Sequence, residues 1–305
     1  MRDTEYQALD GLALATLADR FEAAGLVPFA RTTVPEFCMA PNTEAARNGG
    51  PTRNPWDPTR SSGGSSGGAA AAYLELLAKP PRKMRIIVWR SAFNGVPVAP
   101  ECVAAVERAA ALCRELGHEV VDGTPPDIEY DAFVLAHANV LAGNIVLSVD
   151  TRLGLTGQAL GDDDLEPVLR QGYDYGKTLP AAQYIGSVNR FHAIGRILDS
   201  YLEGSDVILS PSLTQLPLKL GELSTARGSF LDFRRKVSAY GTFSAAFNAS
   251  GQPAASLPLV WTETGLPVGV QVAGRYGRED VVLALSAQLE MAQPWAGRIA
   301  VPQRV

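Results

Sequence analysis

The stretch MRIIVWRSAFNGVPVAPECVAAVERAAALCRELGHEVVD, residues 84–122, carries the clearest sign of the fold. It begins with a short apolar run, residues 84–89, that is typical of a buried strand. Pro100 then opens a helix, Gly117 ends it, and residues 118–122 have the composition of a second strand. Four apolar residues share one face of that helix: Val103, Val106, Ala110 and Cys113. A strand, a helix and a strand within about forty residues predict a right-handed parallel crossover.

The same alternation continues toward the C-terminus. Helices are expected from about residue 130 and over 181–203, 230–247 and 279–292. Strands are expected over 207–210, 254–259 and 268–272, the last two around a turn at 262–265. Alternating strands and helices predict an α/β protein with a buried sheet. We expect one large domain over residues 1–305, although this length also allows two small domains.

Composition and charge exclude several classes of protein. Hydrophobic residues make up 46% of the chain and charged residues 19%, as in soluble globular proteins and unlike disordered ones. The net charge of −5 offers no general attraction to nucleic acid or to anionic membranes. The most lipophilic segment, 133–149, contains His137, Asn139 and Asn144 and is shorter than a membrane span. The first residues form no uninterrupted signal-peptide core, so the sequence predicts a cytoplasmic protein.

The residue types that most often bind metals are few and scattered. The cysteines at 38, 102 and 113 and the histidines at 118, 137 and 192 form no close cluster, so we expect neither a disulfide framework nor a metal site. The acidic run at 162–164 precedes Leu165, and we expect it to cap a helix rather than to bind a metal. The three histidines are expected to be structural or surface residues.

Residues 61–68, SSGGSSGG, are the one low-complexity stretch of the sequence, and alanines at 69–72 follow them. Composition alone favours a flexible linker between two domains. The flanks favour another interpretation, because Asn54-Pro-Trp-Asp-Pro58 forms turns around a large anchor residue and alanine favours helix. A glycine-rich turn that leads into a helix lets backbone N–H groups and serine hydroxyls approach a ligand closely. Such a turn is typical of an active site.

Four segments strengthen this interpretation. They are residues 21–37 with TVPEF at 33–37, residues 54–70 with GGSSGGAA at 63–70, FSAAFNASGQPAASLP at 243–258 and GLPVGVQ at 265–271. Together they resemble the amidase signature family of C–N hydrolases, over nearly the whole chain. The sequences of these segments are most similar to those of the bacterial subgroup that includes cyclic-oligoamide hydrolases of the 6-aminohexanoate type. The resemblance implies an α/β fold with a mixed central sheet flanked by helices, here lacking part of the core.

The resemblance also implies a chemistry. Members of the family use a serine nucleophile, a bridging serine before a cis peptide bond, and a lysine, and they need no metal or organic cofactor. The lysine amine, relayed through the bridging serine, accepts the proton of the attacking hydroxyl and returns it to the leaving nitrogen. The resemblance assigns the bridging role to Ser65 and makes Ser66 its neighbour in the same turn. It implies a small-molecule amide as the substrate.

Two catalytic segments of the family have no match in this sequence. The nucleophile segment should follow the alanines at 69–72, but residues 73–79 already resemble a later part of the family, which places the expected deletion between Ala72 and Tyr73. The lysine segment should lie upstream of the point at which the chain starts. The lysines that this sequence does contain are expected on the surface and not in a catalytic site: Lys79, Lys83, Lys177, Lys219 and Lys236. We therefore expect little or no turnover, since the backbone donors of the oxyanion hole are lost with the nucleophile segment.

Two further residues are candidates for substrate binding. Met39 follows TVPEF, where members of the family line the acyl pocket, although it would fit a plain core equally well. Asn248 could orient a loop near the substrate, or it could instead form a cap or a turn at a helix end.

Two classes of function stay open at this point. The resemblance implies a hydrolase of short aliphatic or cyclic amides, weakly active or inactive as the chain stands. The alternative is a non-catalytic binding or interaction remnant, or the product of an internally deleted gene. No nucleic-acid or membrane partner is expected, and the oligomeric state, homo-oligomers included, is left open.

Overall fold

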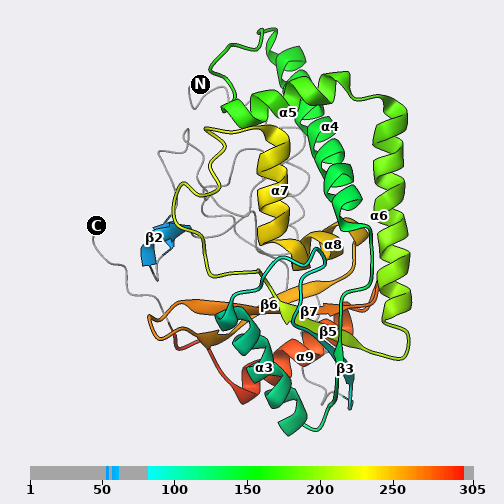
Figure 1. Cartoon of the computed structure of the whole chain (residues 1–305), viewed down its shortest axis with the longest axis vertical. Helices are drawn as coiled ribbons and strands as arrows, with labels where there is room; N and C mark the ends of the chain where they lie inside the picture. The colour runs from blue at the N-terminus through cyan, green and yellow to red at the C-terminus, as the bar shows by residue number, and fades with distance from the viewer. Residues whose placement is uncertain (1–52, 55–56, 62–81, 299–305) are drawn as a thin grey trace, which may run out of the picture. The chain divides into compact units, whose positions relative to one another are not determined.

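The computed structural model describes residues 53–54, 57–61 and 82–298, all of which belong to one compact unit, Val34–Val305. Its elements, shown in Figure 1, are β1 (Arg53–Asn54), β2 (Asp57–Ser61), β3 (Arg85–Trp89), α3 (Pro100–Glu115), β4 (Glu119–Gly123), α4 (Tyr130–Thr156), α5 (Pro167–Thr178), α6 (Ala181–Tyr201), β5 (Val207–Pro211), α7 (Phe230–Tyr240), α8 (Thr242–Ser250), β6 (Ala254–Trp261), β7 (Pro267–Gly274) and α9 (Glu279–Ala292). The predicted strands are confirmed to within two residues at each end. Helix α9 has the predicted bounds.

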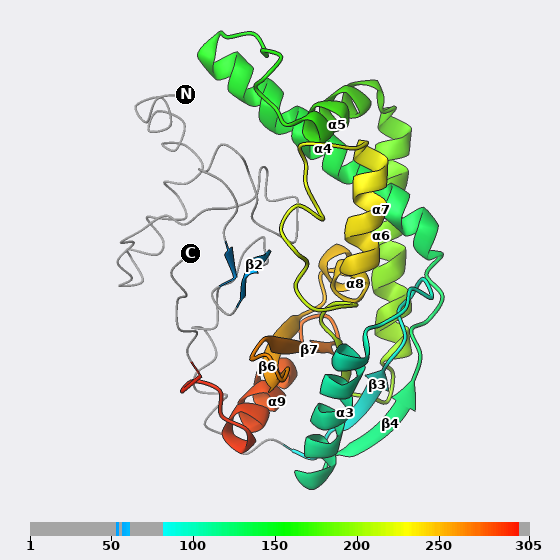
Figure 2. The ribbon, with the colours of Figure 1, turned by 60° about the vertical axis from the view of Figure 1, so that its left-hand side comes forward.

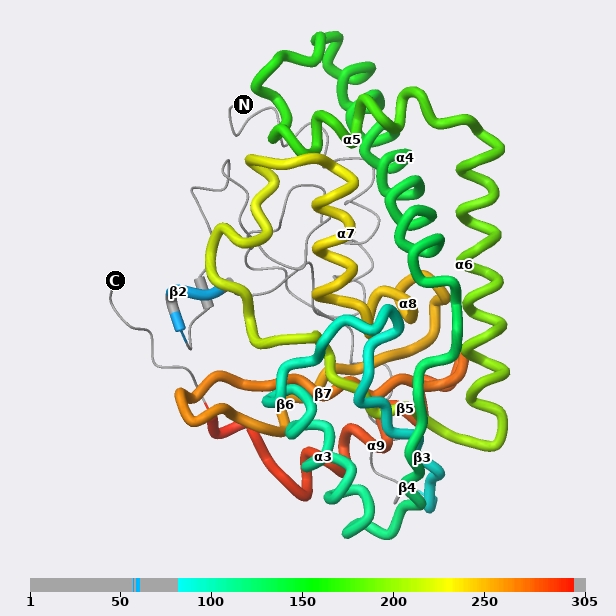
Figure 3. The backbone as a smooth tube through the Cα atoms, viewed as in Figure 1, coloured from blue at the N-terminus to red at the C-terminus, as the bar shows by residue number. Residues whose placement is uncertain are grey.

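Five strands form one mixed sheet in the order β4-β3-β5-β7-β6. Strand β3 pairs in parallel with β4, where Ile86 lies opposite Val120, and in parallel with β5. Strand β7 pairs antiparallel with both β5 and β6. The parallel pair predicted from residues 84–122 is therefore confirmed. The α/β class, with a mixed sheet flanked by helices, is confirmed as well (Figures 1 and 3).

Helices cover both faces of the sheet, and the alternation of side chains along β3 shows how. Ile86 and Val88 are buried on one side, in a core shared with α3 and α9. Ile87 and Trp89 point to the opposite side, where they pack with α6, α8 and the first turn of α4. Figure 2 shows α3 and α9 next to each other, away from α4, α5 and α7.

The long helix α4 is a core helix of the bundle that it forms with α5, α6 and α7. The helix has 27 residues and contains an 18-residue stretch of mean hydropathy 1.7, so by length and composition it is the one helix of the described chain that could cross a membrane. The expectation that this segment is too short was wrong. Its buried Asn139 is hydrogen-bonded to two neighbouring helices. The amide of Asn139 donates to Ser187 of α6 (3.0 Å) and accepts from the hydroxyl of Tyr175 of α5 (2.7 Å). These polar contacts match those of a helix packed within a protein.

The segment 230–247 forms two helices where the sequence predicted one. Helix α7 ends at Tyr240, Gly241 adopts a non-helical conformation (φ −102°, ψ 28°), and α8 starts at Thr242. Glycine has a low helix propensity, which permits this break. The two helices then pack on different cores, α7 on α4 and α5 and α8 on the sheet.

The prediction that the acidic run at 162–164 caps a helix was wrong. Helix α5 begins at Pro167 and is preceded by Glu166, so residues 162–164 lie ahead of the helix rather than at its N-cap. The carboxylate of Asp164 instead accepts the N–H of Gly161 (2.7 Å). The run is a turn-forming element. Among the described residues no group of three or more His, Cys, Asp or Glu side chains is arranged to hold a metal.

Candidate active site

The β1–β2 hairpin, which leads into the glycine-serine segment, contacts the loop that follows β5. Arg60 donates from Nη1 to the carbonyl of Pro217 (2.7 Å), and the N–H of Leu220 donates to the carbonyl of Thr59 (3.1 Å). Arg60 also pairs with Asp57 (3.0 Å), and hydrogen bonds from Thr59 hold the pKa of that carboxyl below its usual value. These contacts fix the C-terminal end of β2 beside residues 217–220. The segment 62–68 continues from this point.

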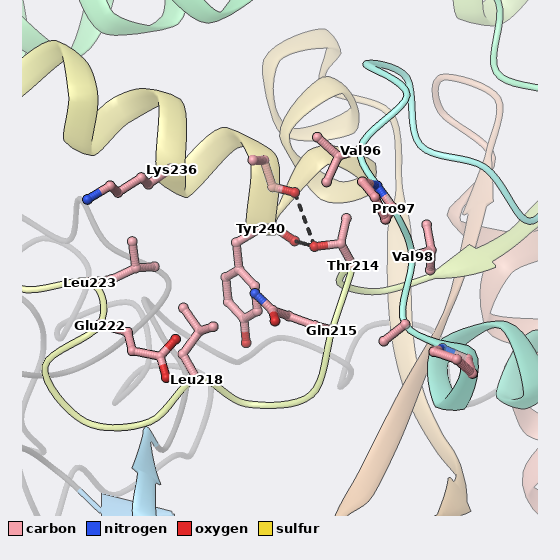
Figure 4. Close-up of a pocket in the computed structure, with 13 residues that line it drawn as sticks. Val96, Pro97, Val98, Thr214, Gln215, Leu218, Glu222, Leu223, Lys236 and Tyr240 are labelled. Carbon is pink, nitrogen blue, oxygen red and sulfur yellow. Dashed lines mark hydrogen bonds between the residues drawn. The ribbon is translucent and has the colours of Figure 1, made fainter.

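A cavity of about 520 Å³ lies next to this loop, between α7, residues 214–223 and the segment that leads into α3 (Figure 4). Much of its wall is apolar: Val96, Pro97, Val98, Leu218 and Leu223. Five polar side chains line it as well: Thr214, Gln215, Glu222, Lys236 and Tyr240. An apolar cavity of this size with a few polar groups is typical of a site for a small molecule.

Thr214 joins three parts of this cavity. Its hydroxyl donates to the carbonyl of Ala239 (3.1 Å), its N–H donates to the carbonyl of Tyr240 (3.0 Å), and its own carbonyl accepts the N–H of Ala99 (2.7 Å). Burial raises the pKa of Tyr240, so the phenol stays protonated at neutral pH. The buried polar side chains of the cavity wall, Thr214 and Tyr240, are therefore uncharged. The charged side chains of Lys236 and Glu222 are exposed.

A second cluster of polar side chains lies where β5 and β7 pair. Gln271 is 4% exposed, and its amide donates to the hydroxyl of Ser210 (3.2 Å) and to the carbonyl of Phe243 (3.4 Å). Next to it, the hydroxyls of Ser212 and Ser256 share a hydrogen bond of 2.6 Å. Gln271 thus ties the two strands to α8. The sequence pointed to GLPVGVQ as a family segment but gave Gln271 no role.

Gly269 should tolerate no side chain between these two serines. A Cβ added at Gly269 would lie 2.8 Å from the hydroxyl oxygens of both Ser212 and Ser256. We expect Gly269→Ala to lower the free energy of unfolding by about 1 to 3 kcal/mol, measured by urea denaturation. The matched control is Gly186→Ala on α6, where an added Cβ meets nothing within 4 Å. That change should raise stability by about 0.5 to 1 kcal/mol, and equal effects at the two sites would contradict the crowding at Gly269.

The predicted site residues divide between the described and the other parts of the chain. Ser65, Ser66 and Met39 lie outside the described residues, as do Lys79 and the expected junction at 72–73. Asn248 is exposed on α8, and it does not line the cavity. It does not cap its helix, because Gly251 does so through its N–H to the carbonyl of Phe247 (3.0 Å). The other lysines are exposed as predicted: Lys83, Lys177, Lys219 and Lys236.

Activated serine and cysteine side chains are absent from the described residues. No serine or cysteine among them is hydrogen-bonded to a described histidine or lysine, the pairing by which a hydroxyl or thiol is activated. Burial raises the pKa of the Cys102 thiol to about 11, which keeps it protonated and unreactive.

Comparison with known proteins agrees with the sequence motifs. A family model described as Amidase matches residues 13–73 and 72–283, in two segments that meet at 72–73. The 6-aminohexanoate-cyclic-dimer hydrolase of Paenarthrobacter ureafaciens is 30% identical over 234 residues, which cover 74% of this chain and 47% of that enzyme. The chain therefore spans about half the length of this relative.

Another relative, AmiB2 of Mycobacterium tuberculosis, is 26% identical over 364 residues, which cover 93% of this chain and 76% of AmiB2. Solved structures share the fold. The 6-aminohexanoate cyclic dimer hydrolase complexed with substrate matches with a TM-score of 0.83 at 24% identity, over 92% of this chain and 78% of that one. A bacterial aryl acylamidase matches with a TM-score of 0.74 at 18% identity, over 90% and 74%.

Proposed function

Because the chain belongs to the amidase family of C–N hydrolases, we propose that it binds a small amide but hydrolyses it weakly or not at all. The observation that carries this proposal is the family match in two segments that meet at 72–73. That is the place where the sequence motifs put the loss of the nucleophile segment. A serine hydroxyl without its activating partners is a poor nucleophile.

The alignment with AmiB2 supports an internal deletion. It runs over 364 positions, whereas 93% of 305 residues is about 284, so about 80 aligned positions of AmiB2 have no counterpart here. We therefore interpret residues 1–305 as a single amidase-like domain that is incomplete between Ala72 and Tyr73. Sequencing the gene across these two codons, together with the intact mass of the protein, tests this interpretation directly.

The cavity supports retained binding. Its lining residues in the described part of the chain lie between Val96 and Tyr240, outside the segment proposed to be missing. Hydrogen bonds of Arg60 to Pro217 and of Leu220 to Thr59 hold the end of β2 beside this loop, and Ser65 and Ser66 follow β2 in the sequence. We assign Ser65 and Ser66 to the proposed site, with Met39 as a further candidate for contact with substrate; Asn248, which does not line this cavity, is not assigned to it.

The substrate that we propose is a short aliphatic or cyclic amide, in line with the relatives named for the cyclic dimer of 6-aminohexanoate. A non-catalytic binding remnant is the second candidate function. The largely apolar cavity favours it, because such a cavity can hold an amide without any nucleophile.

Labelling with a fluorophosphonate probe tests the absence of an activated serine. We expect this chain to show no labelling above that of a Ser65→Ala variant, whereas a full-length amidase of the family is labelled stoichiometrically. The readout is the intact mass after incubation, with the heat-denatured chain as a blank. Stoichiometric labelling accompanied by amide hydrolysis would refute the inactive assignment.

A further inference from the structure

A second cavity, of about 440 Å³, lies between α4 and α7 and is separate from the candidate active site. Its inner wall includes Val134 and Ala138 of α4 together with Arg234 and Ser238 of α7. None of these four residues lines the cavity beside Thr214. The cavity wall thus combines apolar side chains with one guanidinium and one hydroxyl.

Arg234 is a buried cation, only 3% exposed. Its Nη2 atom lies 3.5 Å from Nδ1 of His137. The ring of His137 packs against those of Phe133 and Phe191, with ring centroids 5.7 and 5.9 Å away. Burial and the charge of Arg234 lower the pKa of His137 to about 3, so the imidazole is neutral and can accept a hydrogen bond. Burial lowers the pKa of Arg234 to about 10, which still leaves it charged at neutral pH. His137 thus orients the guanidinium of Arg234, and because the imidazole is uncharged it does not cancel the positive charge of that group.

Ser238 lies four residues after Arg234, and two residues at this spacing lie on the same face of a helix. It is 3% exposed, and its hydroxyl oxygen has no hydrogen-bond partner among the described residues. The hydroxyl of Tyr130 donates to the carbonyl of Ser238 (3.0 Å) and not to its hydroxyl. A buried hydroxyl without a partner destabilises the free protein, and a ligand oxygen would satisfy it.

We propose that this cavity binds a short aliphatic carboxylate, whose oxygens accept hydrogen bonds from Arg234 and Ser238. A guanidinium matches the two oxygens of a carboxylate in one plane. The alkyl chain of the ligand would contact Val134 and Ala138, which an inorganic anion could not use. The two exposed charged residues that line the cavity, Asp131 and Arg235, carry opposite charges, so selection for an anion comes from the buried part of the cavity. This binding does not depend on hydrolysis.

Calorimetric titration of the whole chain with sodium butyrate tests the proposal, with butyramide as the uncharged ligand of the same shape. We expect saturable binding of one butyrate per chain, and butyramide should bind at least about tenfold more weakly. Ser238→Ala should weaken butyrate binding about tenfold, and Arg234→Gln should abolish it. Sodium chloride is kept constant throughout, so that ionic strength does not differ between titrations.

Two variants separate binding from folding. Leu135→Trp enlarges an exposed lining residue without touching a polar group, and it should block butyrate while leaving the circular dichroism spectrum unchanged. Arg278→Gln removes an equal charge just before α9, outside the cavity, and should change the affinity less than about twofold. If Arg234→Gln does not fold, the butyrate affinities of Ser238→Ala and Leu135→Trp test the proposal instead. Equal affinity for butyramide, or wild-type affinity in both of these variants, would overturn the proposal.

Discussion

Purified, this chain should hydrolyse amides at least about a thousandfold more slowly than the 6-aminohexanoate-cyclic-dimer hydrolase of Paenarthrobacter ureafaciens assayed beside it. Loss of one oxyanion-hole donor typically lowers the rate by about a hundredfold to a thousandfold. Loss of a serine nucleophile has a still larger effect, since the remaining groups then have no hydroxyl to activate. The assay follows amine release from a panel of linear and cyclic amides, at equal enzyme concentrations.

The Ser65→Ala variant supplies the control for this prediction. Catalytic groups that act as a unit are strongly non-additive, so removing the bridging serine from a chain that lacks its nucleophile should change the residual rate less than about twofold. A rate close to that of the relative, lost on Ser65→Ala, would mean that the chain contains a working nucleophile. The proposed deletion would then be wrong as an account of its activity.

Much of the fold could be predicted because its signals are local. Pro100 and Gly117 mark the ends of α3 in the sequence itself, and the apolar runs on either side have the length of strands. Gly265 marks the turn between β6 and β7, where its φ of +87° suits glycine. Such residues act through their own backbone, so their effect does not depend on distant parts of the chain.

The elements that the sequence missed depend on tertiary packing. Helix α5 contains Gly172 and Gly176, which lower its helix propensity, yet α5 packs against α4, where a Cβ at Gly176 would lie 2.6 Å from the carbonyl of Ala142. This close contact needs a glycine, and no local pattern shows it. The break at Gly241 likewise follows from the separate cores that α7 and α8 join.

The two cavities could not be predicted for a related reason. Each is built from segments distant in sequence, such as residues 96–100 and 214–240 around Thr214. Arg234 follows the pattern of a surface arginine in a run of charged residues, and only the packing of α7 on α4 buries it. The motif at 63–70 did point to a function, because a family resemblance reports chemistry that composition and periodicity do not contain.

The largest expected change in stability lies at Trp89, at the end of β3. Its side chain is fully buried, its Nε1 donates to the hydroxyl of Tyr201 (3.0 Å), and its ring stacks on Phe247 with centroids 6.0 Å apart. Trp89→Ala removes these contacts and leaves a cavity between the sheet and α8. We expect the free energy of unfolding, measured by urea denaturation, to fall by about 3 to 5 kcal/mol. This is a large part of the total for an ordinary domain, so the variant should be marginally stable.

The same substitution at Trp295 provides the matched comparison. Trp295 is only partly buried, against the core of α3 and α9, so Trp295→Ala removes less apolar surface from the interior and should lower stability by about 1 to 2 kcal/mol. Tyr201→Phe isolates the hydrogen bond, since it leaves the indole N–H of Trp89 without its acceptor at a cost of about 1 to 3 kcal/mol. Trp89→Ala combined with Tyr201→Phe should cost less than the sum of the single changes, because both remove the same contact. If Trp89→Ala were no more destabilising than Trp295→Ala, the face of the sheet toward α6 and α8 would be loosely packed, and the burial described for Trp89 would be wrong.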